Sequence, residues 1–177
     1  MIDELTKIAK HQLRSLLQDQ TKWQGIVIDR RKPITYRAWT MIGTKRLCLH
    51  KFEYIDKDSG EEAFMHPHPW SGGFYIVDGS YAMKLGYTSD RISNEPIGIS
   101  LIHLSPGSKY EITSPLVWHS VTPLTETVYT IMLNDEPWPA DVAHTSVRTT
   151  KGKGLREMTK KELADHLLWF NYNLPLG

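Results

Sequence analysis

Short apolar stretches separated by turn residues constrain this chain more than any other feature. Between residues 25 and 134, segments rich in β-branched and aromatic residues alternate with glycine, proline and polar turns. About nine such stretches at short intervals favour an antiparallel sandwich or barrel. We therefore predict an all-β fold, with the clearest strands at 25–29, 34–42, 45–54, 80–88, 98–104 and 126–134.

One stretch, 60–79, also contains candidate metal ligands. His66 and His68 are one residue apart, so on a strand they point to the same face. Pro67 and Pro69 have no N–H to donate on their side of the strand. The segment is therefore expected at a sheet edge, a bulge or a strand end.

A third histidine strengthens this interpretation. His119 lies in a short apolar stretch, 115–121, after a turn at Pro106-Gly107. A His-x-His pair by itself is as compatible with two ordinary histidines as with a metal site. Three histidine ligands that leave coordination positions open are typical of a reactive metal centre.

The first stretch resembles motif 1 of the cupin family, in which a glycine precedes His-x-His and a second glycine follows. Gly60, His66, His68 and Gly79 match this spacing. Gly72 stands where the family usually has a glutamate ligand.

The second stretch resembles cupin motif 2, a glycine followed by Pro-x-Gly and then histidine. Gly107, Pro115 and His119 match it, whereas Val117 replaces the second glycine and Pro123 stands at the usual asparagine. The resemblance extends over about residues 45 to 134.

The resemblance implies a cupin double-stranded β-helix, a small jelly-roll barrel, with His66, His68 and His119 as metal ligands. The expected organisation is one domain, 1–177, with an N-terminal helix (1–22), the barrel (25–136) and a C-terminal arm and helix (137–177). Three-His cupins include thiol dioxygenases and dioxygenases of diketones or aromatic acids. A divalent metal is therefore implied, with Fe2+ preferred and Zn2+, Mn2+ or Ni2+ as alternatives, and cupins often form homodimers.

Helices are predicted at both ends. An apolar stripe at helical spacing indicates a helix from residue 2 to about residue 20, to be covered by the barrel or by a second subunit. Thr159 and Glu162 have the spacing of a capping box, which predicts a helix at the C-terminal end. The N-terminal stripe consists of Ile2, Leu5, Ile8, Ala9, Leu13, Leu16 and Leu17.

Three neutral ligands would leave the charge of a divalent metal uncompensated, so the site should attract a small anionic organic molecule. Basic residues on predicted strands could hold that anion, and tyrosines could transfer protons. Each of these residues could equally face solvent or pack in the core. The catalytic candidates are Arg37, Lys84, Tyr87 and Tyr129; Arg46, Tyr36 and Tyr75 are further candidates.

The remaining histidines and the cysteine have less specific interpretations. His50 and His103 are expected to be satisfied core or rim histidines, although either could line a pocket. Cys48 is the only cysteine, which excludes an internal disulfide and agrees with a reducing compartment. No role is assigned to His11, His144 or His166.

Charge and hydropathy limit the class of partner. The formal net charge is +1, so no global electrostatic attraction to nucleic acid is expected. The N-terminus has acidic residues and no apolar block, and no apolar run approaches membrane-spanning length. We expect a cytoplasmic protein that binds neither nucleic acid nor a membrane.

Two classes of function agree with these features. The first is a metal-dependent enzyme, a non-haem iron dioxygenase-type oxidoreductase. The second is a non-catalytic cupin that binds a small molecule or a metal. A sugar or keto-acid isomerase or lyase with a non-redox metal is a third alternative.

Overall fold

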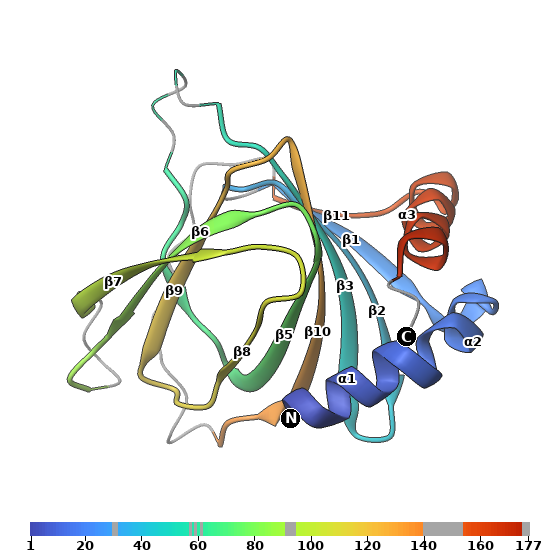
Figure 1. Cartoon of the computed structure of the whole chain (residues 1–177), viewed down its shortest axis with the longest axis horizontal. Coiled ribbons are helices and arrows are strands. Elements are labelled where there is room, and N and C mark those ends of the chain that lie inside the picture. The colour runs from blue at the N-terminus through green and yellow to red at the C-terminus, as the bar shows by residue number, and fades with distance from the viewer. Residues whose placement is uncertain are drawn as a thin grey trace.

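The computed structural model describes residues 1–29, 32–56, 58, 60, 62–90, 95–139 and 154–174. Their strands form two antiparallel sheets with helices on one side (Figure 1). The larger sheet has the order β11 (Leu155–Glu157), β1 (Gln24–Ile28), β2 (Thr35–Ile42), β3 (Lys45–Glu53), β10 (Thr127–Pro137), β5 (Trp70–Asp78), β8 (Lys109–Ile112). The smaller sheet has the order β4 (His66–Pro67), β9 (Val117–Pro123), β6 (Tyr81–Tyr87), β7 (Ile97–Leu104).

The central strands β3 and β10 of the seven-stranded sheet have side chains buried on both faces, and strand alternation decides which face each side chain takes. On β3, Leu47 and Leu49 pack under the helices, whereas Cys48 and His50 face the four-stranded sheet. Alternation along the predicted strand 45–54 puts Leu47 and Leu49 on one face and Cys48 and His50 on the other, and this prediction is confirmed. The same alternation on β10 places Thr130 on the face toward the smaller sheet.

The N-terminal apolar stripe is covered by this same chain. Leu5, Ile8, Leu13 and Leu17 are buried in one cluster with leucines of the larger sheet. The single helix predicted over residues 2–20 is wrong in detail. The chain forms α1 (Ile2–His11), α2 (Leu13–Leu17) and a 3-10 turn, η1 (Gln20–Lys22), because the backbone at Gln12 departs from helical geometry.

The C-terminal helix is confirmed as α3 (Lys160–Asn173). Its capping box is present: the Glu162 N–H donates to Thr159 Oγ1 over 3.2 Å, and the Thr159 N–H donates to Glu162 Oε2 over 2.8 Å. Buried His166, Leu167 and Phe170 attach the helix to the outer face of the larger sheet.

In the sequence, Asp78-Gly79 is a hairpin signal, which predicts that the strands on either side of it pair with each other. This prediction is wrong. Gly79 turns the chain with a φ of 72°, but β5 pairs with β10 and β8, whereas β6 pairs with β9 and β7. A Cβ at Gly79 would also lie 2.3 Å from the carbonyl oxygen of Thr127. The glycine therefore connects the two sheets at a position where only glycine fits.

The all-β fold class with flanking helices is confirmed, and the arrangement is cupin-like. Within the described ranges the strands form two facing sheets and not one closed barrel. No helix among these residues is both long and apolar enough to cross a membrane.

Candidate metal centre

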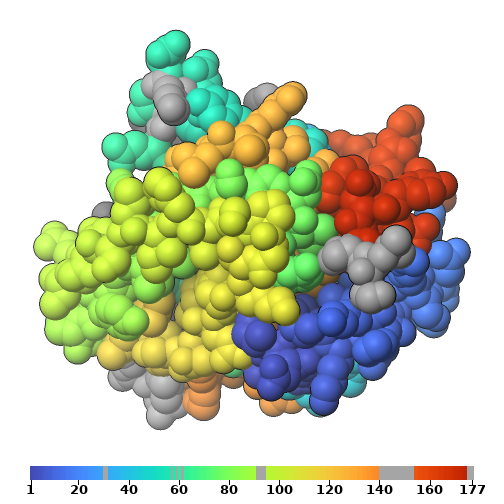
Figure 2. Space-filling model, viewed as in Figure 1, coloured from blue at the N-terminus to red at the C-terminus, as the bar shows by residue number. Residues whose placement is uncertain are grey.

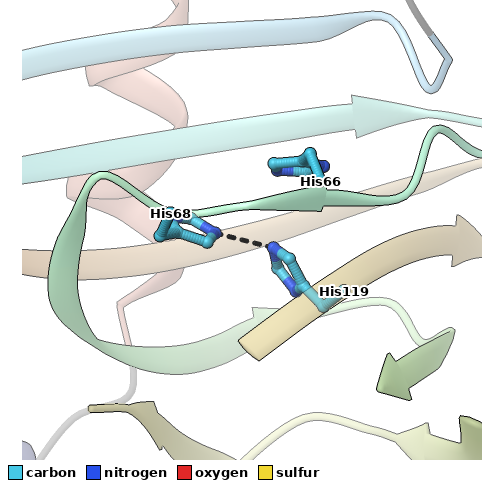
Figure 3. A group of neighbouring side chains, drawn as sticks. All are labelled: His66, His68 and His119. Atoms are coloured by element: carbon cyan, nitrogen blue, oxygen red, sulfur yellow. Dashed lines mark hydrogen bonds between the residues drawn. The ribbon is translucent and has the colours of Figure 1, made fainter. Parts of the chain in front are cut away.

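The three histidines come together from two neighbouring strands (Figure 3). His66 on β4 is the direct strand partner of His119 on β9, and His68 follows on the same side of the chain. β4 is the edge of the four-stranded sheet, as the two prolines predicted. One ring nitrogen from each histidine lies within 4.8 Å of the other two.

Hydrogen bonds orient these rings. His66 Nδ1 lies 3.0 Å from the carbonyl oxygen of Phe64, so Nδ1 carries the proton and the Nε2 lone pair is left for a metal. His68 Nε2 and His119 Nε2 are 2.7 Å apart. Two ligands about 2.1 Å from one ion and at right angles would be separated by about 3.0 Å. The donor set therefore fits a divalent cation with small shifts of the rings.

The packing around Gly72 leaves little space for a side chain that could be a fourth ligand. A Cβ there would lie 3.2 Å from Asn134 Oδ1 and 3.2 Å from Phe74 Cε2. The Phe74 ring also packs against His68 edge-on, with centroids 5.6 Å apart. An aromatic ring thus fills the space beside the position where the cupin family usually has glutamate.

The histidines line one end of a cavity between the two sheets. Its volume is about 60 Å³ for a water-sized sphere, which is room for a few waters or a small organic molecule. The described lining residues include two cationic side chains, Lys32 and Arg37, and no carboxylate. The other lining residues are Ile28, Pro33, Thr35, His50, Phe52, Phe64, His66, His68, Phe74, Tyr81, Tyr110, His119, Val121, Thr130 and Met132.

A polar row crosses the larger sheet on the opposite wall. Arg37, His50 and Thr130 are direct partners on β2, β3 and β10. Arg37 donates from Nε to His50 Nε2 over 2.8 Å, which places the His50 proton on Nδ1, 3.4 Å from Thr130 Oγ1. Burial, together with the positive charge of Arg37, holds the pKa of His50 well below its ordinary value. His50 is therefore neutral and positions Arg37.

Two phenols lie in the same cavity. Tyr81 donates its hydroxyl to the Tyr110 hydroxyl over 3.0 Å, and Tyr110 stacks on Phe74 with centroids 4.5 Å apart. Burial raises the pKa of both phenols above the ordinary value. Both phenols are therefore protonated at neutral pH, and because Tyr81 donates its proton to Tyr110, the Tyr110 hydroxyl is the one left to donate to a ligand.

The structure brings only one of the four catalytic candidates to this cavity. Arg37 lines it, whereas Lys84 is exposed on the other face of the smaller sheet. Tyr87 is 50% exposed near the end of β6. Tyr129 stacks on Trp169 of α3, on the helix side of the larger sheet, because it alternates with inward-facing Thr130.

The other candidates are also elsewhere. Arg46 lies over the rings of Trp39 and Trp70, and it lines a separate pocket. Tyr36 and Tyr75 are absent from the cavity lining, with Lys51 and Lys109 over their respective rings.

Sequence reasoning missed Tyr81, Tyr110 and Lys32. Tyr81 shares a strand face with Met83 and Leu85, which was a usable signal, but Tyr110 lies in a short strand with no distinctive pattern. His50 is both a satisfied core histidine and a cavity residue. Its bond to Arg37 could not be predicted without the register of β2 and β3.

The remaining predictions fall outside the cavity. His103 is exposed on β7, and His166 donates to the carbonyl oxygen of Leu49. Cys48 is buried, and burial raises the pKa of its thiol to about 11, as expected for a packing residue. His144 lies outside the described residues.

Comparisons with known proteins give a weak general likeness. No protein-family model and no curated protein matches the chain. A solved structure of hydroxypropylphosphonic acid epoxidase from S. wedmorenis matches with TM-score 0.46 and 13% identity, over 61% of this chain and 53% of that chain. Fe(II)-HppE with the alternative substrate (S)-1-HPP matches with TM-score 0.48 and 14% identity, over 63% and 55%. The match thus spans about half the length of these chains.

Proposed function

We propose that the protein is a metal-dependent oxidoreductase of the dioxygenase type that acts on a small anionic organic molecule. His66, His68 and His119 would hold one divalent cation, with Fe2+ preferred. The observation that carries this proposal is the convergence of three imidazoles in a cavity whose described lining is cationic and has no carboxylate.

The charge of the site selects the substrate class. Three neutral imidazoles leave a divalent cation with its full charge, and the cationic side chains Arg37 and Lys32 line the same cavity. In a partly desolvated space, an anion offsets this charge more effectively than in water. A carboxylate or a similar small anion is therefore the ligand that the cavity favours.

Each part of the cavity has a role in this proposal. A ferrous ion would supply the redox chemistry with dioxygen. Arg37, held by His50, binds the anionic group and orients the molecule. The Tyr110 hydroxyl, which accepts a hydrogen bond from Tyr81, keeps its own proton to donate to the substrate. Phe64 and Phe74 exclude water from the histidines.

The preference for iron comes from the resemblance to three-His cupins. Imidazole ligands also accept Zn2+, Mn2+ and Ni2+, and the affinity order of divalent metals does not follow function. With a non-redox metal the same cavity would suit an isomerase or lyase acting on an anionic sugar or keto acid.

Metal content tests the centre directly. Protein purified without a metal-affinity tag would be measured by mass spectrometry as wild type and as His66→Ala, His68→Ala and His119→Ala. We expect about one metal per chain in the wild type and a loss of metal in all three variants. His11→Ala, which removes an exposed histidine of α1, is the control and should keep the metal.

The reaction class follows from oxygen uptake by the Fe2+-loaded protein with a panel of small carboxylates and thiols. Substrate-dependent uptake that disappears in His119→Ala supports the dioxygenase proposal. A bound metal without oxygen uptake would indicate isomerase or lyase chemistry. If the wild type binds no metal even after anaerobic reconstitution, the protein is a non-catalytic cupin and the proposal is wrong.

A further inference from the structure

The edge strand β7 differs from the other three sheet edges. β4 has two residues, one of them proline, and β8 and β11 are short strands that carry both acidic and basic side chains. Such features protect sheet edges from pairing with other chains. β7 has eight residues, IGISLIHL, with no charged residue and no proline.

β7 exposes apolar side chains on both of its faces. Ile99 is 54% exposed and Leu101 62%, on the face that Lys84 of β6 shares. Ile102 is 36% exposed on the opposite face, beside Met83. In Figure 1, β7 borders the smaller sheet on the side away from the helices, and Figure 2 shows this segment at the molecular surface.

The presence of exposed apolar side chains on both faces of β7 indicates what kind of partner could bind this strand. A helix or loop that packs on one face would leave the apolar side chains of the other face in water. A strand added edge-on contacts both faces and pairs the outer N–H and C=O groups of β7. In the described part of the chain, β6 is the only strand that pairs with β7.

We propose that β7 pairs antiparallel with β7 of a second copy of this chain, which joins the two small sheets across a two-fold axis. Such an axis is normal to the sheet, so each residue faces a residue of the same sheet face. With the axis at Leu101, Leu101 faces Leu101 of the second copy and Ile99 faces His103. This register clusters the exposed apolar side chains and opposes no like charges.

The backbone supports pairing over one part of the strand. Gly98 has a φ of 62°, and the register with β6 shifts between Leu85 and Tyr87. The start of β7 is therefore irregular, whereas Ile99–Leu104 is regular. The helix stripe offers no competing dimer surface, because Leu5, Ile8 and Leu13 are covered by the chain's own sheet.

Light scattering after gel filtration tests the proposal over a concentration series. The wild type should have twice the chain mass of 20.4 kDa, and Leu101→Lys should fall to 20.4 kDa. Leu101 is 62% exposed in the single chain, so the variant should keep its folded structure, judged by circular dichroism, while the melting temperature loses only the contribution of dimer formation. Leu168→Lys removes a leucine of α3 that is 50% exposed and should remain dimeric. A monomeric wild type, or a dimeric Leu101→Lys, would overturn the proposal.

A cysteine at the axis tests the register. Leu101→Cys places two thiols opposite each other on residues with Cα atoms about 4.5–5.5 Å apart, within disulfide range. Mild oxidation should convert the variant to a disulfide-linked dimer, and the buried Cys48 should leave the wild type unlinked. A lack of linkage at Leu101→Cys, Ser100→Cys and Ile102→Cys alike would refute the pairing of β7.

Discussion

Replacing Gly72 with glutamate tests why this centre has three protein ligands. The backbone at Gly72 is not in the left-handed region, so space alone decides the outcome. The new Cβ would lie 3.2 Å from both Asn134 Oδ1 and Phe74 Cε2, closer than ordinary van der Waals contact. The rest of the side chain would have to displace the Phe74 ring.

The expected cost has two sources. Overpacking costs about 1–3 kcal/mol, and a buried carboxyl group with incomplete hydrogen bonding costs about 1–3 kcal/mol more. In a chain of this size, 1 kcal/mol lowers the melting temperature by about 2–4 °C. Gly72→Glu should therefore melt about 5–20 °C below the wild type in the presence of a chelator. A bound cation would offset part of this loss, because the carboxylate then becomes a fourth ligand.

Thermal unfolding with a chelator and with added Zn2+ separates the two effects. We expect added metal to raise the melting temperature of Gly72→Glu more than that of the wild type. Gly72→Ala is the control, since it adds only the Cβ and should show a small loss that metal does not change. If Gly72→Glu melts like the wild type in chelator, or gains no more than the wild type from metal, Phe74 does not block the fourth position.

Three further predictions concern parts of the fold. Burial lowers the pKa of His166 to about 4 from an unfolded value of about 6.5. The neutral imidazole therefore stabilises the fold above pH 6.5, and the free energy of unfolding falls by up to about 3 kcal/mol as the pH drops toward 4. In denaturant unfolding, His166→Gln should lose less of this free energy between pH 7 and pH 4.5 than the wild type. Arg37→Lys cannot reproduce the hydrogen bond to His50 and should weaken binding of a small carboxylate to the zinc-loaded protein by about tenfold or more, measured by calorimetry. Thr159→Ala removes the cap of α3 and should cost about 1 kcal/mol in unfolding experiments, whereas Thr159→Ser should retain most of it.

The sequence predicted the strands and the histidine cluster because both depend on local rules. Alternation with a period of two assigned Leu47 and His50 to opposite faces of β3, and two prolines placed His66 and His68 at a sheet edge. These rules use only neighbours within a few residues.

The tyrosines that line the cavity could not be identified in this way. Tyr81 and Tyr87 share one pattern on β6, yet Tyr81 is 1% exposed and Tyr87 50%. Alternation gives the face of a strand but not the position along it that lies opposite the cavity. The location of Tyr129 could not be predicted for another reason: both faces of β10 are apolar, so the sequence pattern does not show which face meets the helices. The prediction of a hairpin at Asp78-Gly79 is wrong because the same turn residues can join two paired strands or connect two different sheets.

The helices that cover the larger sheet also fix the geometry of the cavity. A shift of one residue in the pairing of β3 with β10 would exchange the faces of every side chain on the shifted strand. Leu49 and Ile131 are direct partners under the helices, and His50 and Thr130 are direct partners in the cavity. Burial of the leucine side therefore holds the register that places His50, and with it the hydrogen-bonded Arg37, in the cavity that the three histidines line. The packing of the N-terminal helices and the position of Arg37 in the cavity thus depend on the same strand registers, those of β2 with β3 and of β3 with β10.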